Sequence, residues 1–435
     1  MRNRVEKYLE VIKNTNKVEY YGKVNKVVGL TIESKGPEVN IGELCNIQTS
    51  EGSIISEVVG FNDDNVLLMP LGDMKGVGPG NRVISNKETL KIRVGEELIG
   101  RVIDGLGNPI DGFCLDNLTH AYEIERDVPH PLMRSRIEEP MYLGIKAVDG
   151  LLTLGKGQRI GVFAGSGVGK STLLGMITRN AQSDINVVAL IGERGREVKE
   201  FLEKDLGPEG LARSVVIVAT SDQPALIRLK AAFTATVIAE YFRDQGKDVL
   251  LMMDSLTRFA MAQREVGLAS GEPPISRGYT PSVFSMLPKL LERAGQSEKG
   301  SITGIYTVLV DGDDFNEPIT DAARGILDGH IMLSRKLASQ NQYPAINVLE
   351  SVSRVMKDVV SQDHVDLAAK FKSVLANYRD AEDLINIGAY VKGSSPKIDY
   401  AISIYDNMIN FLKQDVNKKN DPQETLQTLS SLLSN

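Results

Sequence analysis

The spacing of hydrophobic and polar positions changes several times along the chain, and each change predicts a different kind of structure. Residues 1–13 carry apolar side chains at helical spacing among charged ones, which predicts a short amphipathic helix. Its apolar positions are Val5, Tyr8, Leu9 and Ile12. Such a helix either packs on its own domain or docks a partner or a lipid surface, and the sequence leaves both alternatives open.

From about Tyr21 to Val94 the pattern becomes one of short β-branched runs separated by glycines and prolines. The runs lie at residues 23–28, 30–33, 54–59 and 65–69. Residues 71–80 hold too many glycines for a central strand and predict connecting turns. Together these features predict a small all-β barrel.

Beyond a turn-rich connector, which begins at Arg101 and extends past Pro129, apolar strand patterns alternate with helical patterns. The expected strands are Arg159–Phe163, Val187–Ile191, Val215–Ala219, Val249–Met253 and Ser301–Val310, with helices after the first, third and fourth. This alternation predicts a doubly wound α/β domain, with a parallel sheet and crossover helices.

Strand patterns stop near Met356, and the rest of the chain predicts a small helical domain. One helical face is expected to carry Ile398, Ile402, Tyr405, Ile409 and Leu412. The end of the chain, from Asn417, is polar and then partly leucine-patterned, so it is expected to be either a helix or a frayed tail. The predicted organisation is an N-terminal helix plus β-barrel over 1–92, an α/β domain over 93–355 and a helical domain over 356–435.

Composition excludes several classes of protein. The 435 residues are 42% hydrophobic and 25% charged, the ordinary globular balance, and the length favours more than one domain. No apolar run approaches the roughly 20 residues that cross a bilayer, and the N-terminus has no secretory signal, so a cytoplasmic protein is expected. A net charge of −7 argues against a globally basic, nucleic-acid-coating protein. Cys45 and Cys114 are isolated from each other and from the histidines, and both are expected to be packing residues.

The first chemical signal lies at residues 164–172, which read Ala-Gly-Ser-Gly-Val-Gly-Lys-Ser-Thr between an apolar strand and an apolar helix. Glycines at these positions let backbone N–H groups surround phosphates at a helix N-terminus. Lys170 is expected to reach the β- and γ-phosphates, and Ser171 to bind magnesium. The predicted nucleotide-binding residues are Gly165, Ser166, Gly167, Val168, Gly169, Lys170, Ser171, Thr172 and, farther along, Tyr343. Ala164 departs from the strict pattern, which begins with glycine.

Hydrolysis needs a magnesium anchor, an aligned water and positive charge for the transition state. Asp254 ends an apolar strand, where a Walker-B aspartate holds magnesium, and Glu193 follows another strand, where it could polarise the attacking water. The alternative for Glu193 is a salt-bridged surface turn. Tyr343 is a candidate for stacking on adenine and Arg354 for an arginine finger. The predicted catalytic residues are therefore Glu193, Lys170 and Arg354, and the predicted metal ligands are Ser171 and Asp254.

These motifs resemble the hexameric ATPases related to the α and β subunits of rotary ATP synthases, and within them the flagellar and virulence type III export ATPases. The resemblance covers about residues 20–412. Its most specific runs lie at 149–171, 192–198, 254–265, 271–274, 278–284 and 343–347. The sequence Phe-Ala-Gly-Ser-Gly, which starts at Phe163, is similar to the export branch and accounts for Ala164.

The resemblance implies a RecA-like P-loop NTPase core with an N-terminal β-barrel and a C-terminal helical domain. It also implies ATP and Mg²⁺ as ligands, with ATP sites between the subunits of a homo-hexameric ring. It assigns Lys170 and Ser171 to phosphate and magnesium, and Asp254 to magnesium. Glu193 would act on the water, Tyr343 on adenine, and Arg354 on the γ-phosphate of the neighbouring subunit's site. Non-catalytic synthase subunits lack the matching glutamate, so the chain is expected to hydrolyse ATP.

The implied function is ATP hydrolysis coupled to the export of flagellar proteins through a type III secretion apparatus. The implied partners are a regulatory stator protein at the N-terminal helix, a central stalk protein, the export gate and chaperone–cargo complexes. The loop at 278–280 would face the central channel, and the protein would be cytoplasmic and peripheral at the inner membrane. No specific nucleic-acid partner is expected.

Three alternatives stay open from the sequence: a virulence secretion ATPase, a catalytic or nucleotide-binding subunit of a rotary synthase, and a RecA-like nucleic-acid motor. Glu193 and the compact helical C-terminus count against the synthase alternative. The motor needs a channel with basic and aromatic residues. Few aromatic residues in the N-terminal β region, together with the acidic net charge, count against it.

Overall fold

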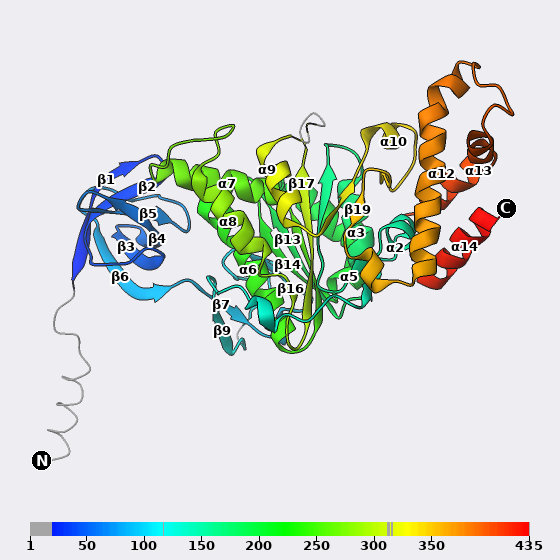
Figure 1. Ribbon diagram of the computed structural model, residues 1–435. Helices are drawn as coiled ribbons and strands as arrows, with labels where there is room; N and C mark the ends of the chain where they lie inside the picture. Colours follow the sequence, from blue (N-terminus) through cyan, green and yellow to red (C-terminus); the bar gives the residue numbers. More distant parts are fainter. Residues whose placement is uncertain (1–19, 116, 311–313, 315, 435) are drawn as a thin grey trace, which may run out of the picture. The chain divides into compact units, whose positions relative to one another are not determined.

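The structure is a computed structural model that describes residues 20–115, 117–310, 314 and 316–434. The helix predicted for residues 1–13 lies outside the described residues. The chain divides into two compact units (Figure 1). The first runs to Leu90 and includes Leu268–Glu272, and the second contains Lys91–Gly267 and the chain from Pro273 onwards. In the described part of the chain, no helix is long and apolar enough to cross a membrane.

Six antiparallel strands close into a barrel in the first unit, in the order β1-β2-β5-β4-β3-β6. The strands are β1 (Tyr21–Val28), β2 (Thr31–Lys35), β3 (Glu43–Thr49), β4 (Gly52–Asn62), β5 (Asn65–Pro70) and β6 (Arg82–Thr89). Alternating side chains point inward and fill the barrel with an apolar core, as a period of two dictates. That core consists of Val24, Ile32, Cys45, Ile47, Val58, Val66, Leu68 and Val83. The predicted barrel is confirmed, and residues 71–80 form turns as expected.

The second unit is built on a nine-stranded sheet with the order β19-β18-β12-β17-β15-β13-β14-β8, in which β16 pairs with β17. The strands are β8 (Val102–Asp104), β12 (Arg159–Ala164), β13 (Ile185–Ile191), β14 (Ser214–Ala219), β15 (Asp248–Asp254), β16 (Gly295–Gln296), β17 (Ser301–Leu309), β18 (Gly329–Met332) and β19 (Val352–Ser353). From β18 to β8 neighbouring strands are parallel. All five predicted strands are present, and their neighbours in the sheet confirm the α/β class.

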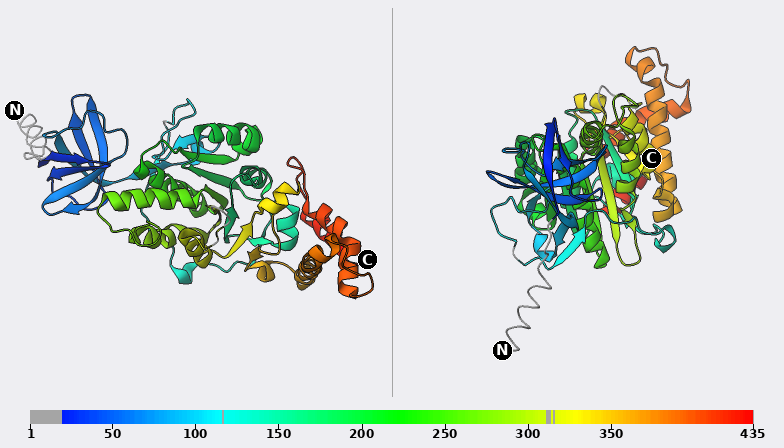
Figure 2. Two further views of the ribbon diagram at one scale, coloured as in Figure 1. Left: turned by 90° about the horizontal axis from the view of Figure 1, so that it is seen from above. Right: turned by 90° about the vertical axis from the view of Figure 1, so that its left-hand side faces the viewer.

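Helices lie on both faces of this sheet (Figure 2). The helices from β12 to the start of the C-terminal domain are α3 (Lys170–Asn180), α4 (Gly195–Glu200), α5 (Gly207–Leu211), α6 (Ala225–Asp244), α7 (Leu256–Ala269), α8 (Pro281–Leu291), α9 (Pro318–Ile326), α10 (Arg335–Ser339) and α11 (Met356–Val359). A π-helical turn, η3 (Phe201–Leu206), joins α4 to α5. The predicted helices after β12, β14 and β15 are present as α3, α6 and α7, and the structure adds helices that were not predicted, among them α9 after β17 and α4 after β13. The helical pattern there is weak because α4 buries only Val198 among its six residues, so the apolar periodicity that signals a helix is missing.

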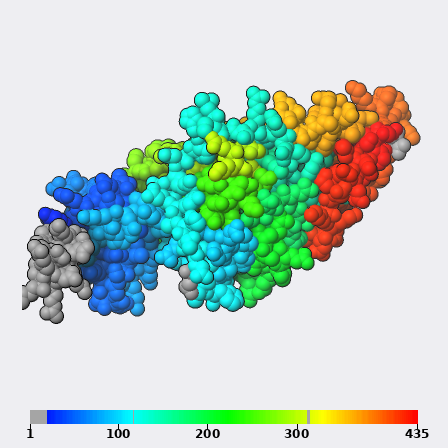
Figure 3. Space-filling model, turned by 90° about the horizontal axis from the view of Figure 1, so that it is seen from below, coloured from blue at the N-terminus to red at the C-terminus, as the bar shows by residue number. Residues whose placement is uncertain are grey.

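The connector predicted near Arg101 contains regular structure. β8 forms the edge strand of the sheet beside β14, and β7 (Lys91–Val94) pairs with β9 (His120–Glu123). Three-residue β8 is too short to show an alternating pattern in the sequence. The 3₁₀ turn η1 (Glu96–Leu98) precedes the connector, and a second, η2 (Pro131–Met133), lies in it. Farther along the chain, β10 (Pro140–Met141) pairs with β11 (Leu154–Gly155). The connector forms much of the cyan surface in Figure 3. Cys114 is exposed here, so the packing prediction holds only for Cys45.

The C-terminal helices share an apolar core with α2 (Lys146–Leu151). They are α12 (Gln362–Asn386), α13 (Pro396–Leu412) and α14 (Pro422–Ser434), so the tail is a helix. The face predicted for α13 is partly wrong. Its buried residues are Ala401, Ile404, Met408, Phe411 and Leu412, whereas Ile402 is 38% exposed. Because α13 packs against α12, α14 and α2 together, the positions of three neighbours select the buried stripe.

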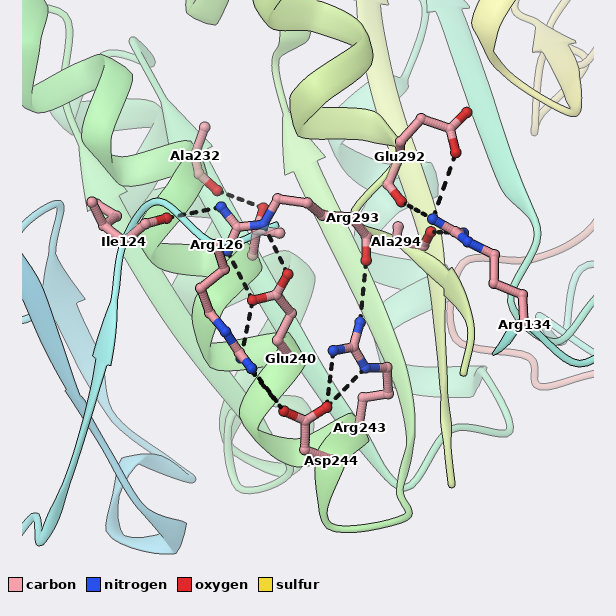
Figure 4. Close-up of polar contacts among 11 residues, drawn as sticks. Ile124, Arg126, Arg134, Ala232, Glu240, Arg243, Asp244, Glu292, Arg293 and Ala294 are labelled. Atoms are coloured by element: carbon pink, nitrogen blue, oxygen red, sulfur yellow. Dashed lines mark hydrogen bonds and ion pairs between the residues drawn. The ribbon is translucent and has the colours of Figure 1, made fainter. Parts of the chain in front are cut away.

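A buried group of charges lies where the connector crosses α6 and the residues after α8 (Figure 4). Arg293 donates from Nε and Nη2 to the two carboxylate oxygens of Glu240, at 2.8 Å each, and the two side chains are 2% and 1% exposed. Arg293 Nη1 also donates to the carbonyl oxygen of Ile124 at 2.8 Å. Arg126 of the connector reaches Glu240 at 3.3 Å and Asp244 at 3.4 Å. These contacts join three segments that are far apart in the sequence.

Candidate active site

The glycine-rich turn after β12 has the conformation of a phosphate-binding loop. Gly167 and Gly169 have φ values of +77° and +85°, in the left-handed region that residues other than glycine rarely adopt. The 11-residue helix α3 begins directly afterwards, at Lys170. Its first N–H groups, together with those of the turn, make a site suited to anionic phosphates. Ser166 and Gly167 are exposed there, whereas Val168 is buried and anchors the turn.

Lys170, Asp254 and Glu193 converge at the carboxyl edge of the parallel sheet. They follow or end the strands β12, β15 and β13, and β17 lies between β12 and β15. Nζ of Lys170 forms a short ion pair with Oδ1 of Asp254 and lies 3.6 Å from Oε1 of Glu193. The side chains are only 12%, 6% and 15% exposed. The sheet therefore collects three predicted residues, separated in the sequence, in one largely buried cluster at the edge where doubly wound folds bind ligands.

Thr307, on the intervening strand β17, fixes the carboxylate of Asp254. Its Oγ1 donates to Oδ1 of Asp254 at 2.6 Å, and the threonine is fully buried. Asp254 is itself 4% exposed at the end of β15. A hydrogen bond from a neighbouring strand limits the rotation of the carboxylate, so the group is held in place at the sheet edge.

Burial and neighbouring charges perturb the ionisation of this cluster. Burial lowers the pKa of Lys170, but the attraction of Asp254 and Glu193 outweighs burial, and the net pKa lies above the usual value for lysine. Burial, with repulsion from Asp254, raises the pKa of Glu193 to about 7 against the attraction of Lys170. A carboxyl group that titrates near neutral pH is suited to accepting and releasing a proton.

The backbone around Glu193 is held by the neighbouring strand β14. Gly192, with φ +69°, donates its N–H to the carbonyl oxygen of Ala219 at 2.7 Å, and the carbonyl of Glu193 accepts from the N–H of Ser221 at 3.0 Å. Glu193 is thus part of a rigid strand exit. The arginines and glutamates that follow, at the start of α4 and within it, form ion pairs near the surface, such as Arg194 with Glu197 at 2.8 Å. The salt-bridged surface turn therefore begins one residue after Glu193.

Tyr343 lies beside the phosphate-binding turn. Its Cε1 is 3.4 Å from the point where a Cβ atom on Gly169 would be, so the ring covers the last glycine of the turn. The residue is 43% exposed. An aromatic face that is fixed on one side and open on the other offers a surface on which a nucleotide base can stack.

Arg354 lies apart from the cluster. It follows β19 and is exposed; its N–H donates to the carbonyl oxygen of Asp328 at 3.1 Å, and its Nη2 to the carbonyl oxygen of Arg324 at 3.4 Å. Among the described residues, no hydrogen bond or ion pair joins Arg354 to Lys170, Glu193 or Asp254. Its guanidinium is therefore presented at the surface of the molecule.

The predicted metal ligands fit magnesium. The hydroxyl of Ser171 and the carboxylate of Asp254 are hard oxygen donors, the kind that Mg²⁺ prefers. Over residues 20–115, 117–310, 314 and 316–434, no group of three or more His, Cys, Asp and Glu side chains could hold a metal ion. A magnesium ion that is bound together with a nucleotide uses one or two protein ligands and completes its shell with phosphates and water.

Comparison with known proteins identifies the family. Residues 144–353 match the nucleotide-binding domain of the ATP synthase alpha/beta family, and residues 24–86 match the beta-barrel domain of the same family. The Flagellum-specific ATP synthase of Bacillus subtilis (strain 168) is 56% identical over 99% of this chain and 99% of its own length. The chain belongs to the ATP synthase alpha/beta family. The predicted family is thereby confirmed, and the protein is an ATPase.

Several similar proteins within this family are named for type III secretion. Residues 360–431 match the T3SS EscN ATPase C-terminal domain. The Type 3 secretion system ATPase of Xanthomonas euvesicatoria is 51% identical over 95% of this chain and 94% of its own length. The structure of the assembled ATPase EscN from the enteropathogenic E. coli type III secretion system has a TM-score of 0.91 and 49% identity, covering 95% of this chain and all of that one. EscN in complex with its central stalk EscO has a TM-score of 0.88.

Two residues near the site of this family member were missed by the sequence analysis. One is Thr307, whose signal was a polar side chain within an apolar strand pattern. The other is Arg258, one helical turn after Asp254. A Cβ atom on Gly192 would lie 2.9 Å from Cβ of Arg258, so the arginine packs beside the residue that precedes Glu193. Its Nε is buried and has no hydrogen-bond partner among the described residues.

Proposed function

We propose that this chain hydrolyses Mg²⁺-bound ATP at sites shared between neighbouring copies of a homo-hexamer, and that hydrolysis powers the export of flagellar proteins. The observation that carries the proposal is the convergence of Lys170, Asp254 and Glu193 behind a phosphate-binding loop. Phosphoryl transfer to water requires a group that binds the phosphates, a group that holds the metal and a group that activates the water. Lys170, Asp254 and Glu193 are the respective candidates.

In this proposal the loop residues 165–172 bind the phosphates through backbone N–H groups, and Lys170 contacts the β- and γ-phosphates. Ser171 and Asp254 hold Mg²⁺, which neutralises the charge that develops on the phosphates. The ion pair between Lys170 and Asp254 keeps both groups at the sheet edge, and in this proposal Lys170 turns from Asp254 to the phosphates when nucleotide binds.

Glu193 polarises the attacking water. Its raised pKa means that a carboxylate and a protonated form are both accessible near neutral pH, as a general base needs. Arg258, with its unpartnered buried Nε, adds positive charge beside Glu193 and would stabilise the transferred phosphoryl group. Tyr343 stacks on adenine.

Arg354 acts on the site of a neighbouring copy. Its exposed position, away from Lys170 and Glu193, suits a finger that is inserted from one subunit into the next. The EscN relative is described as an assembled ATPase, which supports a ring for this chain. Each active site is then incomplete in an isolated subunit.

The export role rests on whole-length relatives named for flagella and for type III secretion. We favour the flagellar system because 56% identity with the Bacillus relative exceeds 51% identity with the Xanthomonas relative. The partners in this proposal are a central stalk protein, as in the EscN–EscO complex, a stator protein at the N-terminal helix, the export gate and chaperone–cargo complexes. The protein would act in the cytoplasm, at the periphery of the inner membrane.

We also propose a division into three domains, 1–92, 93–355 and 356–435. The first boundary falls near the division between the two compact units, which lies after Leu90. The second falls after β19, where strands end, and precedes the long helices α12 to α14.

Steady-state ATP hydrolysis, measured as a function of protein concentration with the mass of the particles determined alongside, tests this function. Activity per subunit is expected to rise as hexamers appear, because each site needs Arg354 of a neighbour. Nucleotide binding without turnover at every concentration would instead favour a structural, synthase-like subunit. Restored filament assembly in a flagellated strain that lacks its own export ATPase would support the flagellar assignment, whereas restored secretion of virulence effectors alone would contradict it.

A further inference from the structure

Gln414 lies in the loop between α13 and α14 and contacts the residue that we propose as the platform for adenine. Its backbone N–H donates to the carbonyl oxygen of Tyr343 at 3.0 Å. The ring of Tyr343 in turn covers Gly169 of the phosphate-binding loop. The loop at residues 413–418 therefore contacts the backbone that carries this ring.

The side chain of Gln414 anchors this loop from within. It is 8% exposed, and its amide makes three hydrogen bonds, all with main-chain atoms. Oε1 accepts from the N–H of Lys146 at 2.8 Å, while Nε2 donates to the carbonyl oxygens of Gly144 and Lys418 at 2.8 and 2.7 Å. One end of the amide meets a donor and the other meets two acceptors, so the partners define its orientation.

The turn that receives this amide is tightly packed against the phosphate-binding helix. Gly144 has φ +72°, and a Cβ atom there would lie 2.6 Å from Cβ of Asn180, the last residue of α3. The buried carboxylate of Asp149 accepts from the N–H groups of Leu143 and Gly144 at 2.8 Å each. The anchor for Gln414 is thus a rigid part of the domain that carries Lys170.

A second contact ties the same loop to α3 from outside. Nη2 of Arg179, in the last turn of α3, donates to the carbonyl oxygen of Val416 at 2.9 Å at an exposed position. Loop 413–418 is therefore attached to the far end of the helix that begins at Lys170. The loop, Tyr343 and α3 form one connected arrangement.

We propose that Gln414 is a positioning residue for the base of the bound nucleotide, acting through Tyr343. This inference rests on the proposed function, in which Tyr343 stacks on adenine. Among the described residues, no hydrogen bond joins Gln414 to Lys170, Glu193 or Asp254. Removal of the amide thus loosens the platform for the base and leaves the groups that bind phosphate and activate water in place.

The test compares two ligands on the full-length Gln414→Ala variant: Mg·ATP, and Mg·tripolyphosphate, which has the phosphates but no base. Stacking of a base on an aromatic side chain is worth about 5- to 150-fold in affinity. The Kd and KM for ATP are expected to rise at least about 5-fold, within that range. The Kd for tripolyphosphate is expected to stay within about 2-fold of wild type, and kcat at saturating ATP is expected to be retained. Titration calorimetry and steady-state hydrolysis measure these quantities.

Three further variants sharpen the comparison. Gln414→Glu keeps the size of the side chain but loses both donors to the carbonyls of Gly144 and Lys418, so it is expected to behave like Gln414→Ala. Gln427→Ala removes an exposed glutamine from α14, in the same C-terminal helical domain, and is the matched control, with no expected change. Arg179→Ala removes the exposed hydrogen bond to the carbonyl oxygen of Val416. It is expected to raise the Kd for ATP by a smaller factor than Gln414→Ala does, and to leave the Kd for tripolyphosphate unchanged. It tests the proposal even where a Gln414 variant does not fold.

The outcomes separate this inference from the proposed function. One outcome is that Gln414→Ala binds ATP as well as wild type does, while Tyr343→Ala loses affinity for ATP but not for tripolyphosphate. This outcome would overturn the role of Gln414 and keep the assignment of Tyr343 to the base. Equal weakening of both ligands in Gln414→Ala would also overturn it, since the amide would then support the whole site. If Tyr343→Ala itself does not discriminate between the two ligands, the assignment of Tyr343 to adenine fails.

Discussion

Replacement of Arg293 by methionine removes one half of the buried ion pair in Figure 4 and leaves Glu240 without its main partner. Glu240 is 1% exposed, and both of its carboxylate oxygens accept from Arg293 at 2.8 Å. Arg126 still reaches Glu240, but at 3.3 Å and from a side chain that is 34% exposed. Removal of one partner from a buried pair costs about 3–5 kcal/mol of folding free energy, because the other charge stays in the interior.

Proton uptake limits the part of this cost that comes from the buried charge. An interior carboxyl can escape its charge by binding a proton, which at pH 7 costs about 3.7 kcal/mol for a group that titrates near 4.3 in water. The Arg293→Met variant is therefore expected to lose about 3–4 kcal/mol at pH 7. At pH 5 the same proton uptake costs only about 1 kcal/mol, so the loss of stability becomes smaller as the pH falls.

A double variant separates the charge from the packing. When both members of a buried pair are replaced by apolar residues of similar size, stability is often unchanged or increased. Arg293→Met combined with Glu240→Met is therefore expected to be more stable than Arg293→Met alone, which gives a coupling energy in a double-mutant cycle. Lys199→Met is the matched surface control: Lys199 pairs with Glu203 at 3.7 Å and is 74% exposed. It is expected to change stability by less than about 0.5 kcal/mol.

Urea unfolding followed by far-ultraviolet circular dichroism measures these changes, since the chain contains no tryptophan and urea does not screen charges. Hydrogen exchange of peptides from α6 (Ala225–Asp244) assigns the loss to this part of the second unit. The reasoning is refuted if Arg293→Met stays within about 1 kcal/mol of wild type at both pH values. It is also refuted if the double variant loses the sum of the two single losses.

The proposed roles and the buried charges give three further expectations. Glu193→Gln is expected to keep nucleotide affinity and lose at least about 100-fold in kcat, because an amide cannot take up the proton of the attacking water; unchanged turnover would sink the role of Glu193. Arg354→Ala is expected to regain part of its activity in mixed rings with Glu193→Gln subunits, and absence of rescue in a mixing titration would count against a finger that acts in trans. Burial lowers the pKa of Lys372 to about 8, so its positive charge destabilises the folded state below that pH. This destabilisation disappears as the pH rises towards 10.5, the usual pKa of lysine. Lys372→Met is therefore expected to be more stable than wild type by up to about 3 kcal/mol at pH 7, with a gap that closes between pH 8 and 10.5 in urea unfolding; a gap independent of pH would contradict this account.

Much of the candidate site could be predicted because its chemistry is encoded locally. Residues 165–170 form their turn through the left-handed conformations of Gly167 and Gly169, which depend on the missing side chain and not on distant contacts. Asp254 and Glu193 were recognisable because each stands at the end of an apolar strand, and parallel strands end at one edge. Residues without such a local pattern were missed: Arg258 stands beside Gly192 only because α7 packs next to the exit of β13.

The sequence by itself determined the order of barrel, α/β core and helices, because alternation and helical periodicity are properties of neighbouring residues. It also supplied the candidate side chains for the chemistry. Only the tertiary structure decided the partners of the buried polar groups. Glu240 and Arg293 are 53 residues apart, and Gln414 binds the carbonyl of Gly144 from 270 residues away. Burial of each of these polar groups requires a hydrogen-bond or ion-pair partner. The pattern of residues within one segment does not show which distant segment provides that partner.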